Sequence, residues 1–186
     1  MTNRFHFLAL AIFSLLLSNC DKNDKLPECP QCDFTCLDGS EPNVFSNDCK
    51  DNWDCLYRLH ENSQLNYVLE EYFDQVNINA GNKLVFETNL STLGEANIAD
   101  DEVTDFLYFE IDPSQESFAA EGDELDLLNV RFQQQCFCAN VHFRKPASGC
   151  MQGQKIDDSH WKIQANLVIE YDSWTQEVRV DAVYAK

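Results

Sequence analysis

The sequence contains little glycine, little proline and few basic residues. Its 186 residues include 6 glycines, 5 prolines and 13 lysines and arginines, against 32 aspartates and glutamates. The low glycine and proline content excludes collagen-like and low-complexity chains. The net charge of −19 disfavours a nucleic-acid partner, because phosphates are bound by basic surfaces. It also disfavours a flat contact with an anionic membrane leaflet.

No apolar run is long enough to cross a membrane as a helix. The longest run of apolar and small residues, 7–17, has eleven residues, whereas a spanning helix needs about 20. Roughly 7–15 residues are typical of the apolar region of a signal peptide. Arg4 places a positive charge before the run, as signal peptides require. The run is therefore predicted to be a signal segment.

The end of this segment, Leu17-Ser18-Asn19-Cys20, resembles the lipobox of bacterial outer-membrane and surface lipoproteins. Leu17 and Ser18 match the pattern, and Asn19 stands where Gly, Ala or Ser is usual. The resemblance implies cleavage before Cys20 and attachment of acyl chains such as palmitate to that cysteine, which would then hold the protein on the membrane. It also implies a location in the cell envelope, at the outer membrane or cell surface. Asp21 leaves the periplasmic face of the inner membrane as an alternative.

Eight further cysteines follow Cys20, and an even number in an exported chain predicts a disulfide framework. They are Cys29, Cys32, Cys36, Cys49, Cys55, Cys136, Cys138 and Cys150. The first five form one group in the sequence and the last three another, and both numbers are odd. If all eight pair, at least one bridge must join the two groups, while the full connectivity stays open.

Two other interpretations of the first cysteine group remain open. The spacing of Cys29, Cys32 and Cys36 also suits zinc, although an oxidising compartment favours disulfides. Residues 36–49 resemble the Kazal inhibitor pattern in Asp38-Gly39, Phe45 and Asn47, but the cysteines stand two residues too far apart.

Alternation of apolar and polar residues predicts a β-domain in the second half of the chain. Apolar residues recur with period two in 84–90, 107–111, 128–132 and 137–143, and a further strand is predicted at 150–156. The clearest runs, 161–171 and 174–184, flank Asp172-Ser173 and predict a hairpin. A looser first strand is predicted at 53–59. These short strands predict a mainly β fold, an antiparallel β-sandwich that is Ig-like or barrel-like.

One helix is predicted before this β-domain, at residues 65–76, with Ser63 as its N-cap. Its apolar residues share one helical face: Leu65, Val68, Leu69, Tyr72, Phe73 and Val76. We therefore expect four parts: a signal peptide (1–19), a lipidated tether (20–28), a disulfide-stapled cysteine-rich segment packed on the β-domain (29–62), and a helix plus antiparallel β-domain (63–186).

No catalytic or metal-binding motif accompanies the candidate residues. The three histidines after the leader, His60, His142 and His160, lie in no recognisable hydrolase, metalloprotease or phosphate-binding pattern. The acidic clusters at 100–105 and 121–126 could supply oxygen ligands to calcium, but their spacing is not that of an EF-hand and a solvated loop is expected. We predict no catalytic residue, no cofactor and no metal site.

The sequence therefore predicts a lipid-anchored, non-enzymatic envelope protein with a binding, adhesion or structural role and an unidentified protein or glycan ligand. One alternative is an envelope hydrolase with an unrecognised site. Another is a glycan-binding module that uses Trp53, Trp161 and Trp174. Trp161 and Trp174 fall on the core-facing phase of their strands, which argues against the glycan-binding alternative.

Overall fold

The computed structural model describes residues 43–49, 51–94, 102–136 and 142–186, and these residues are mainly β, as predicted. The strands are β1 (Asn43–Ser46), β2 (Trp53–Val68), β3 (Gln75–Ala80), β4 (Lys83–Thr92), β5 (Thr104–Ile111), β6 (Ser117–Glu121), β7 (Arg131–Gln135), β8 (Pro146–Lys155), β9 (His160–Glu170) and β10 (Thr175–Ala185). The only helix in the described residues is a 3-10 helix, η1 (Gly122–Leu128).

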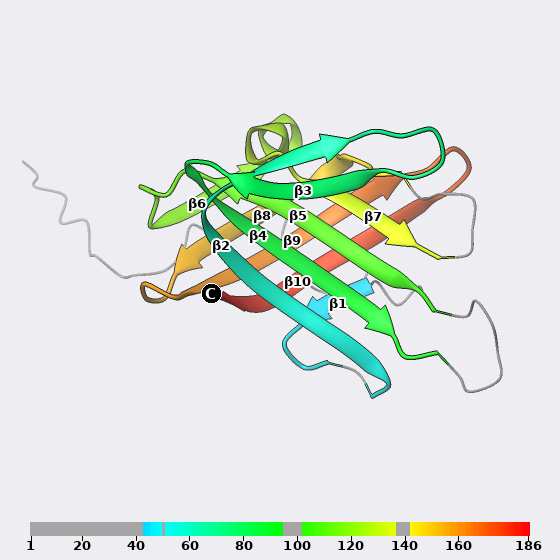
Figure 1. Cartoon of the computed structure of the whole chain (residues 1–186), viewed down its shortest axis with the longest axis horizontal. Coiled ribbons are helices and arrows are strands. Elements are labelled where there is room, and N and C mark those ends of the chain that lie inside the picture. The colour runs from blue at the N-terminus through cyan, green and yellow to red at the C-terminus, as the bar shows by residue number, and fades with distance from the viewer. Residues whose placement is uncertain (1–42, 50, 95–101, 137–141) are drawn as a thin grey trace, which may run out of the picture.

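All the strands belong to one mixed sheet (Figure 1). Its order is β6-β8-β9-β10-β2-β4-β5-β7, with β1 beside β10 and β3 beside β2. Most neighbours are antiparallel, but β1 and β2 both run parallel to β10. The contact between β10 and β2 is a single pair, Ala185 with Arg58. The sheet is mixed rather than purely antiparallel, and among the described strands it does not close into a barrel.

The two halves of this sheet face each other across an aromatic core. Phe86 of β4 stacks on Phe109 of β5, with ring centroids 4.5 Å apart, and meets Trp161 of β9 edge-on at 5.7 Å. Phe45 of β1 lies 6.3 Å from Phe132 of β7. Because the contacts of Phe86 with Trp161 and of Phe45 with Phe132 join strands from opposite halves, the sheet folds over on itself as a sandwich does. Each buried side chain of this size contributes about 1.5–3 kcal/mol.

The predicted hairpin at 161–184 is confirmed. Strands β9 and β10 pair from Thr175 and Glu170 at the turn to Ala185 and His160 at the far end. The N–H of Tyr171 donates to the carbonyl oxygen of Trp174 across 2.9 Å, which closes the turn around Asp172-Ser173. The apolar phase of both strands lies in the core, as period two requires.

The helix predicted at 65–76 is wrong. Strand β2 continues to Val68, then pairs with β3 in a hairpin. A bulge at Asn62, with φ of 49°, redirects the second half of β2, which runs across the sheet at the top of Figure 1. The N–H of Leu65 donates to the Glu110 carboxylate at 2.8 Å, which holds the hairpin against β5.

Three other predicted elements differ in the structure or fall outside it. The strand expected at 128–132 begins later, at Arg131, because Leu128 ends η1. Residues 137–141 of the strand expected at 137–143 lie outside the described residues, and 142–143 are not in a strand. The expected signal peptide (1–19) and lipidated tether (20–28) also lie outside the described residues. Strand β2 runs through positions 62 and 63, the expected boundary between the cysteine-rich segment and the β-domain.

Candidate functional site

The structure describes four of the nine cysteines. Cys49 and Cys55 form a disulfide that ties the β1–β2 connection to β2, so the expected presence of disulfide bonding is confirmed. Cys136 and Cys150 are also disulfide-bonded. The predicted lipid-attachment residue Cys20 and the cysteines Cys29, Cys32, Cys36 and Cys138 lie outside the described residues.

His60, His142 and His160 lie apart, and each contacts a carboxylate. His60 of β2 lies 2.7 Å from Glu87 of β4, on the outer face of the sheet. The Nδ1 of His142 lies 3.2 Å from Asp74, while His160 begins β9. These separate pairs do not bring two histidines to one site.

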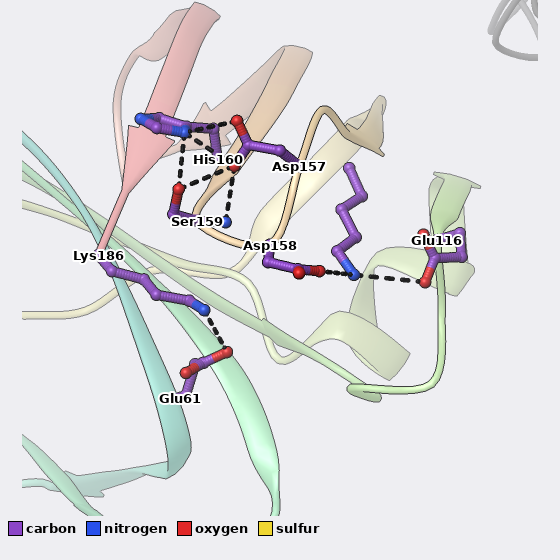
Figure 2. A network of polar contacts seen from close by, with 8 residues as sticks. Glu61, Glu116, Asp157, Asp158, Ser159, His160 and Lys186 are labelled. Carbon is purple, nitrogen blue, oxygen red and sulfur yellow. Dashed lines mark hydrogen bonds and ion pairs between the residues drawn. The ribbon is translucent and has the colours of Figure 1, made fainter.

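A serine, a histidine and an aspartate do meet at the β8–β9 turn, as Figure 2 shows. The Nδ1 of His160 lies 2.9 Å from both the Ser159 hydroxyl and an Asp157 oxygen. In a catalytic triad the two ring nitrogens serve different partners, one the nucleophile and one the carboxylate. Here both partners meet the same nitrogen, and the Ser159 N–H also donates to Asp157 at 2.7 Å. The trio is the hydrogen-bonded turn of a hairpin.

The two acidic clusters have separate roles. In the second cluster, Glu121 and Glu124 form a capping box at the start of η1, and Asp126 pairs with Lys145 at 2.7 Å. In the first, Asp105 is only 1% exposed, so the expectation of a solvated loop is wrong for that residue. It falls on the core-facing phase of β5. Among the described residues, no three histidine, cysteine or acidic side chains gather where they could hold a metal ion.

A charged pocket of about 360 Å³ lies at the end of the sheet that carries the β8–β9 turn and Lys186. Its floor is apolar, formed by Leu59, Leu84 and Trp161. Its rim carries Lys186, paired with Glu61 at 2.7 Å, and Lys155, paired with Asp158 at 3.0 Å. Figure 2 shows the labelled members of these pairs facing one another. Lys155 also lies 3.5 Å from Glu116, so the two lysines are paired with three carboxylates and neither lysine is free to bind an anionic ligand.

The opposite end of the sheet carries exposed apolar side chains on the β2–β3 turn. Leu69 and Tyr72 are each 75% exposed, and Val68 and Phe73 are more than a third exposed. Asp74 at the end of this turn is buried, and its carboxylate accepts hydrogen bonds from the N–H groups of Glu70 at 3.3 Å and Phe143 at 2.8 Å. The buried carboxylate therefore fixes the turn in the conformation that displays these side chains.

The β9–β10 turn adds a tryptophan to the same end. Trp174 is 44% exposed, so its predicted place in the core is wrong, because β10 begins one residue later. Its indole stacks on the buried ring of Tyr171, with centroids 4.0 Å apart and planes inclined by 10°. Burial, with the nearby carboxylate of Asp105, raises the pKa of Tyr171 to about 12, so the ring stays neutral at physiological pH.

Residues 142–144 connect these two turns. The Phe143 N–H donates to Asp74 of the β2–β3 turn. The next residue, Arg144, places its guanidinium 5.7 Å from the centre of the Tyr171 ring. Both turns lie on the right of Figure 1. We call Val68, Leu69, Tyr72, Phe73, Tyr171 and Trp174 the aromatic end.

Comparisons with protein families, with characterised proteins and with solved structures give no match to this chain. In the part of the chain that the structure describes, no helix is long and apolar enough to cross a membrane. Sequence reasoning missed the aromatic end because it assigned the turn residues to a helix and Trp174 to the core. The available signal was the turn at Asp172-Ser173, because Trp174 directly follows it and connecting segments lie on the protein surface.

Proposed function

We propose that this chain is a lipid-anchored cell-envelope protein without enzymatic activity that binds a ligand through its aromatic end. The anchor is supported by Leu17-Ser18-Asn19-Cys20 after an eleven-residue apolar run. Acyl chains on Cys20 would hold the protein stably, because more than one chain is needed for lasting membrane attachment. The tether would then present the β-domain at the membrane surface.

The observation that carries the binding role is the exposure of Leu69 and Tyr72 on a turn that Asp74 holds rigid. Exposed apolar side chains that cluster on a surface mark interaction sites, whereas single ones need no explanation. A rigid arrangement also binds more tightly than a mobile one, since less conformational freedom is lost on binding. The aromatic end satisfies both conditions.

Binding is favoured over hydrolysis by the arrangement of the polar side chains. The Ser159, His160 and Asp157 contacts converge on one ring nitrogen, which leaves no relay from nucleophile through base to carboxylate. The charged pocket beside them has its lysines neutralised by Glu61 and Asp158. Neither feature supports the hydrolase alternative.

The anchor is tested by Cys20→Ser in the full-length chain. We expect wild type to remain in a carbonate-washed membrane pellet and Cys20→Ser to move to the soluble fraction, because no acyl chain can be attached to serine. Asp21→Ser is the matched control, since it changes the neighbouring residue and keeps the cysteine, and it should pellet with the membrane. Retention of Cys20→Ser in the washed pellet would contradict the proposed anchor.

A further inference from the structure

The exposed indole of Trp174 is a flat surface with a fixed orientation. One face is covered by the Tyr171 ring at 4.0 Å, so the exposed 44% of the side chain comprises the other face and the ring edges. The support is itself held in place: the Tyr171 hydroxyl donates to Gln176 at 3.2 Å, and its N–H closes the turn onto the carbonyl of Trp174. The indole is therefore preorganised to receive a flat partner.

Along the chain, the exposed neighbours of Trp174 are polar and, where charged, negative, while the guanidinium of Arg144 lies 5.7 Å from the centre of the supporting Tyr171 ring. Asp172, Ser173 and Thr175 are exposed next to it in the chain, and Glu170 is exposed at the end of β9. Hydroxyl and carboxylate groups are hydrogen-bond acceptors, and the hydroxyls are also donors. The two carboxylates repel an anionic polymer or an anionic membrane surface. A ligand that suits this surface has one apolar flat face, many hydroxyl groups and no negative charge.

A sugar ring has this combination of properties. The axial C–H bonds of a pyranose with equatorial hydroxyls form an apolar face, whose hydrogens carry the partial positive charge that the π face of an indole attracts. The hydroxyl groups at the rim of the ring then reach the polar neighbours. We infer that Trp174, supported by Tyr171, is the stacking platform of a carbohydrate-binding site for uncharged or amino-bearing glycans.

The aromatic end offers a second exposed ring besides that of Trp174. Residues 142–144 connect the Trp174 turn to the β2–β3 turn, where Tyr72 offers a second exposed ring. An oligosaccharide would therefore bind more tightly than a monosaccharide, because a second contact forms within an already bound ligand. This inference rests on the proposed binding function and specifies its ligand.

The test is affinity electrophoresis and titration calorimetry of the folded protein with a fixed panel of glycans. The panel contains laminarin, xyloglucan, dextran and chitin oligosaccharides, with alginate as the anionic member. We expect binding to at least one uncharged or amino-bearing member and none to alginate. Of the three tryptophans, Trp161 is 2% and Trp174 44% exposed, so binding should also change the fluorescence of the exposed indole.

Variants of Trp174 test whether the glycan binds at this residue. Trp174→Ala should weaken it about tenfold or more, as loss of a stacking contact does, and Trp174→Phe should retain part of it. Ile156→Ala, another exposed apolar side chain, should bind as wild type does, and near-UV circular dichroism checks that each variant is folded.

Three outcomes overturn the inference: no panel member binds, a folded Trp174→Ala binds as wild type does, or the surface binds phosphatidylcholine vesicles instead of glycans. The first two leave the fractionation of Cys20→Ser unaffected, and the carbonate wash removes a protein held only by surface contact with lipid. Failure of the ligand assignment and failure of the anchor are therefore distinguishable.

Discussion

Two buried aspartates show how the surroundings of a side chain determine its role. Asp74 receives two backbone N–H groups and orders the turn that displays Leu69 and Tyr72. Asp105 is equally buried and accepts a hydrogen bond from Gln134 at 2.9 Å. Burial nevertheless raises the pKa of Asp105 from 3.8 to about 6, because removing a carboxylate from water disfavours its charged form.

The raised pKa of Asp105 predicts a pH-dependent cost to stability. Below a pH of about 4 the carboxyl is protonated in both the folded and unfolded protein, so the cost is absent. Between about 4 and 6 the unfolded chain releases this proton and the folded protein keeps it, so the free energy of unfolding falls as pH rises. Above a pH of about 6 the full cost remains, at most about 3 kcal/mol.

Asp105→Asn should therefore stabilise the protein at neutral pH, since the amide is uncharged and its oxygen can still accept the hydrogen bond from Gln134. We expect thermal unfolding at pH 7.5 to show a higher Tm for the variant, and the gain to disappear towards pH 3.5. Asp172→Asn, at an exposed aspartate, should change the Tm little at either pH. A gain for Asp105→Asn that is equal at both pH values would contradict a titration of this carboxyl.

At the scale of elements, period two identified the strands wherever one face is buried. Strand β9 alternates between buried and less buried residues along its length, whereas Val85, Tyr108 and Arg179 are buried on the opposite phase of β4, β5 and β10. The core-facing phase of β5 extends to Asp105. The pattern at 65–76 failed for a physical reason. Leu69 and Tyr72 are not core residues but displayed ones, so their spacing reflects an exposed turn and not the buried face of a helix. Trp174 also lies on an exposed turn, which explains why its predicted place in the core is wrong.

Gly149 and Gly122 allow a test of strand packing with a matched control. Both have positive φ, 119° and 54°, where a Cβ is unfavourable. A Cβ on Gly149 of β8 would lie 2.2 Å from the carbonyl oxygen of Asn166 on β9, whereas one on Gly122 would meet nothing within 4 Å. Gly149 therefore carries a packing constraint in addition to the conformational one.

We expect Gly149→Ala to destabilise the protein by roughly 3 kcal/mol or more, because the β8–β9 backbones must separate. Gly122→Ala should cost about 1–2 kcal/mol, the conformational term alone. Urea denaturation of both variants measures the difference. Equal losses of stability would show that β9 yields to the added methyl group without strain.

At the scale of the whole molecule, the sequence predicted a mainly β fold with disulfide bonding but not how the sheet is connected. Parallel pairing of β1 with β10 joins residues 43–46 to 178–181, and no local pattern indicates a partner so distant in the chain. The single pair between Ala185 and Arg58 joins the two halves in the same way. Such long-range contacts depend on packing of the complete chain.

The disulfide pairing is one long-range feature that the sequence does constrain, because each of the two cysteine groups contains an odd number of cysteines. Cys49 and Cys55 pair with each other, which leaves Cys29, Cys32 and Cys36 in the first group. The second group contains Cys136, Cys138 and Cys150, of which Cys136 and Cys150 are bonded. Three cysteines cannot pair completely among themselves. If all eight cysteines are bonded, at least one bridge must therefore connect the two groups.

We predict that non-reducing peptide mapping will recover a peptide from residues 29–36 linked to one from residues 136–150. Such a bridge closes a loop of roughly 100 residues or more, which in the chain-entropy model stabilises the folded protein by about 4–5 kcal/mol. It would fix the cysteine-rich segment on the β-domain, so that only the tether separates the domain from a lipidated Cys20.

Reduction should consequently lower the Tm by more than the Cys49→Ser, Cys55→Ser double variant does, since that bridge closes a much shorter loop. A map with bridges only inside each group, and one free thiol in each, would contradict the prediction and leave the segment as a flexible connection between anchor and domain.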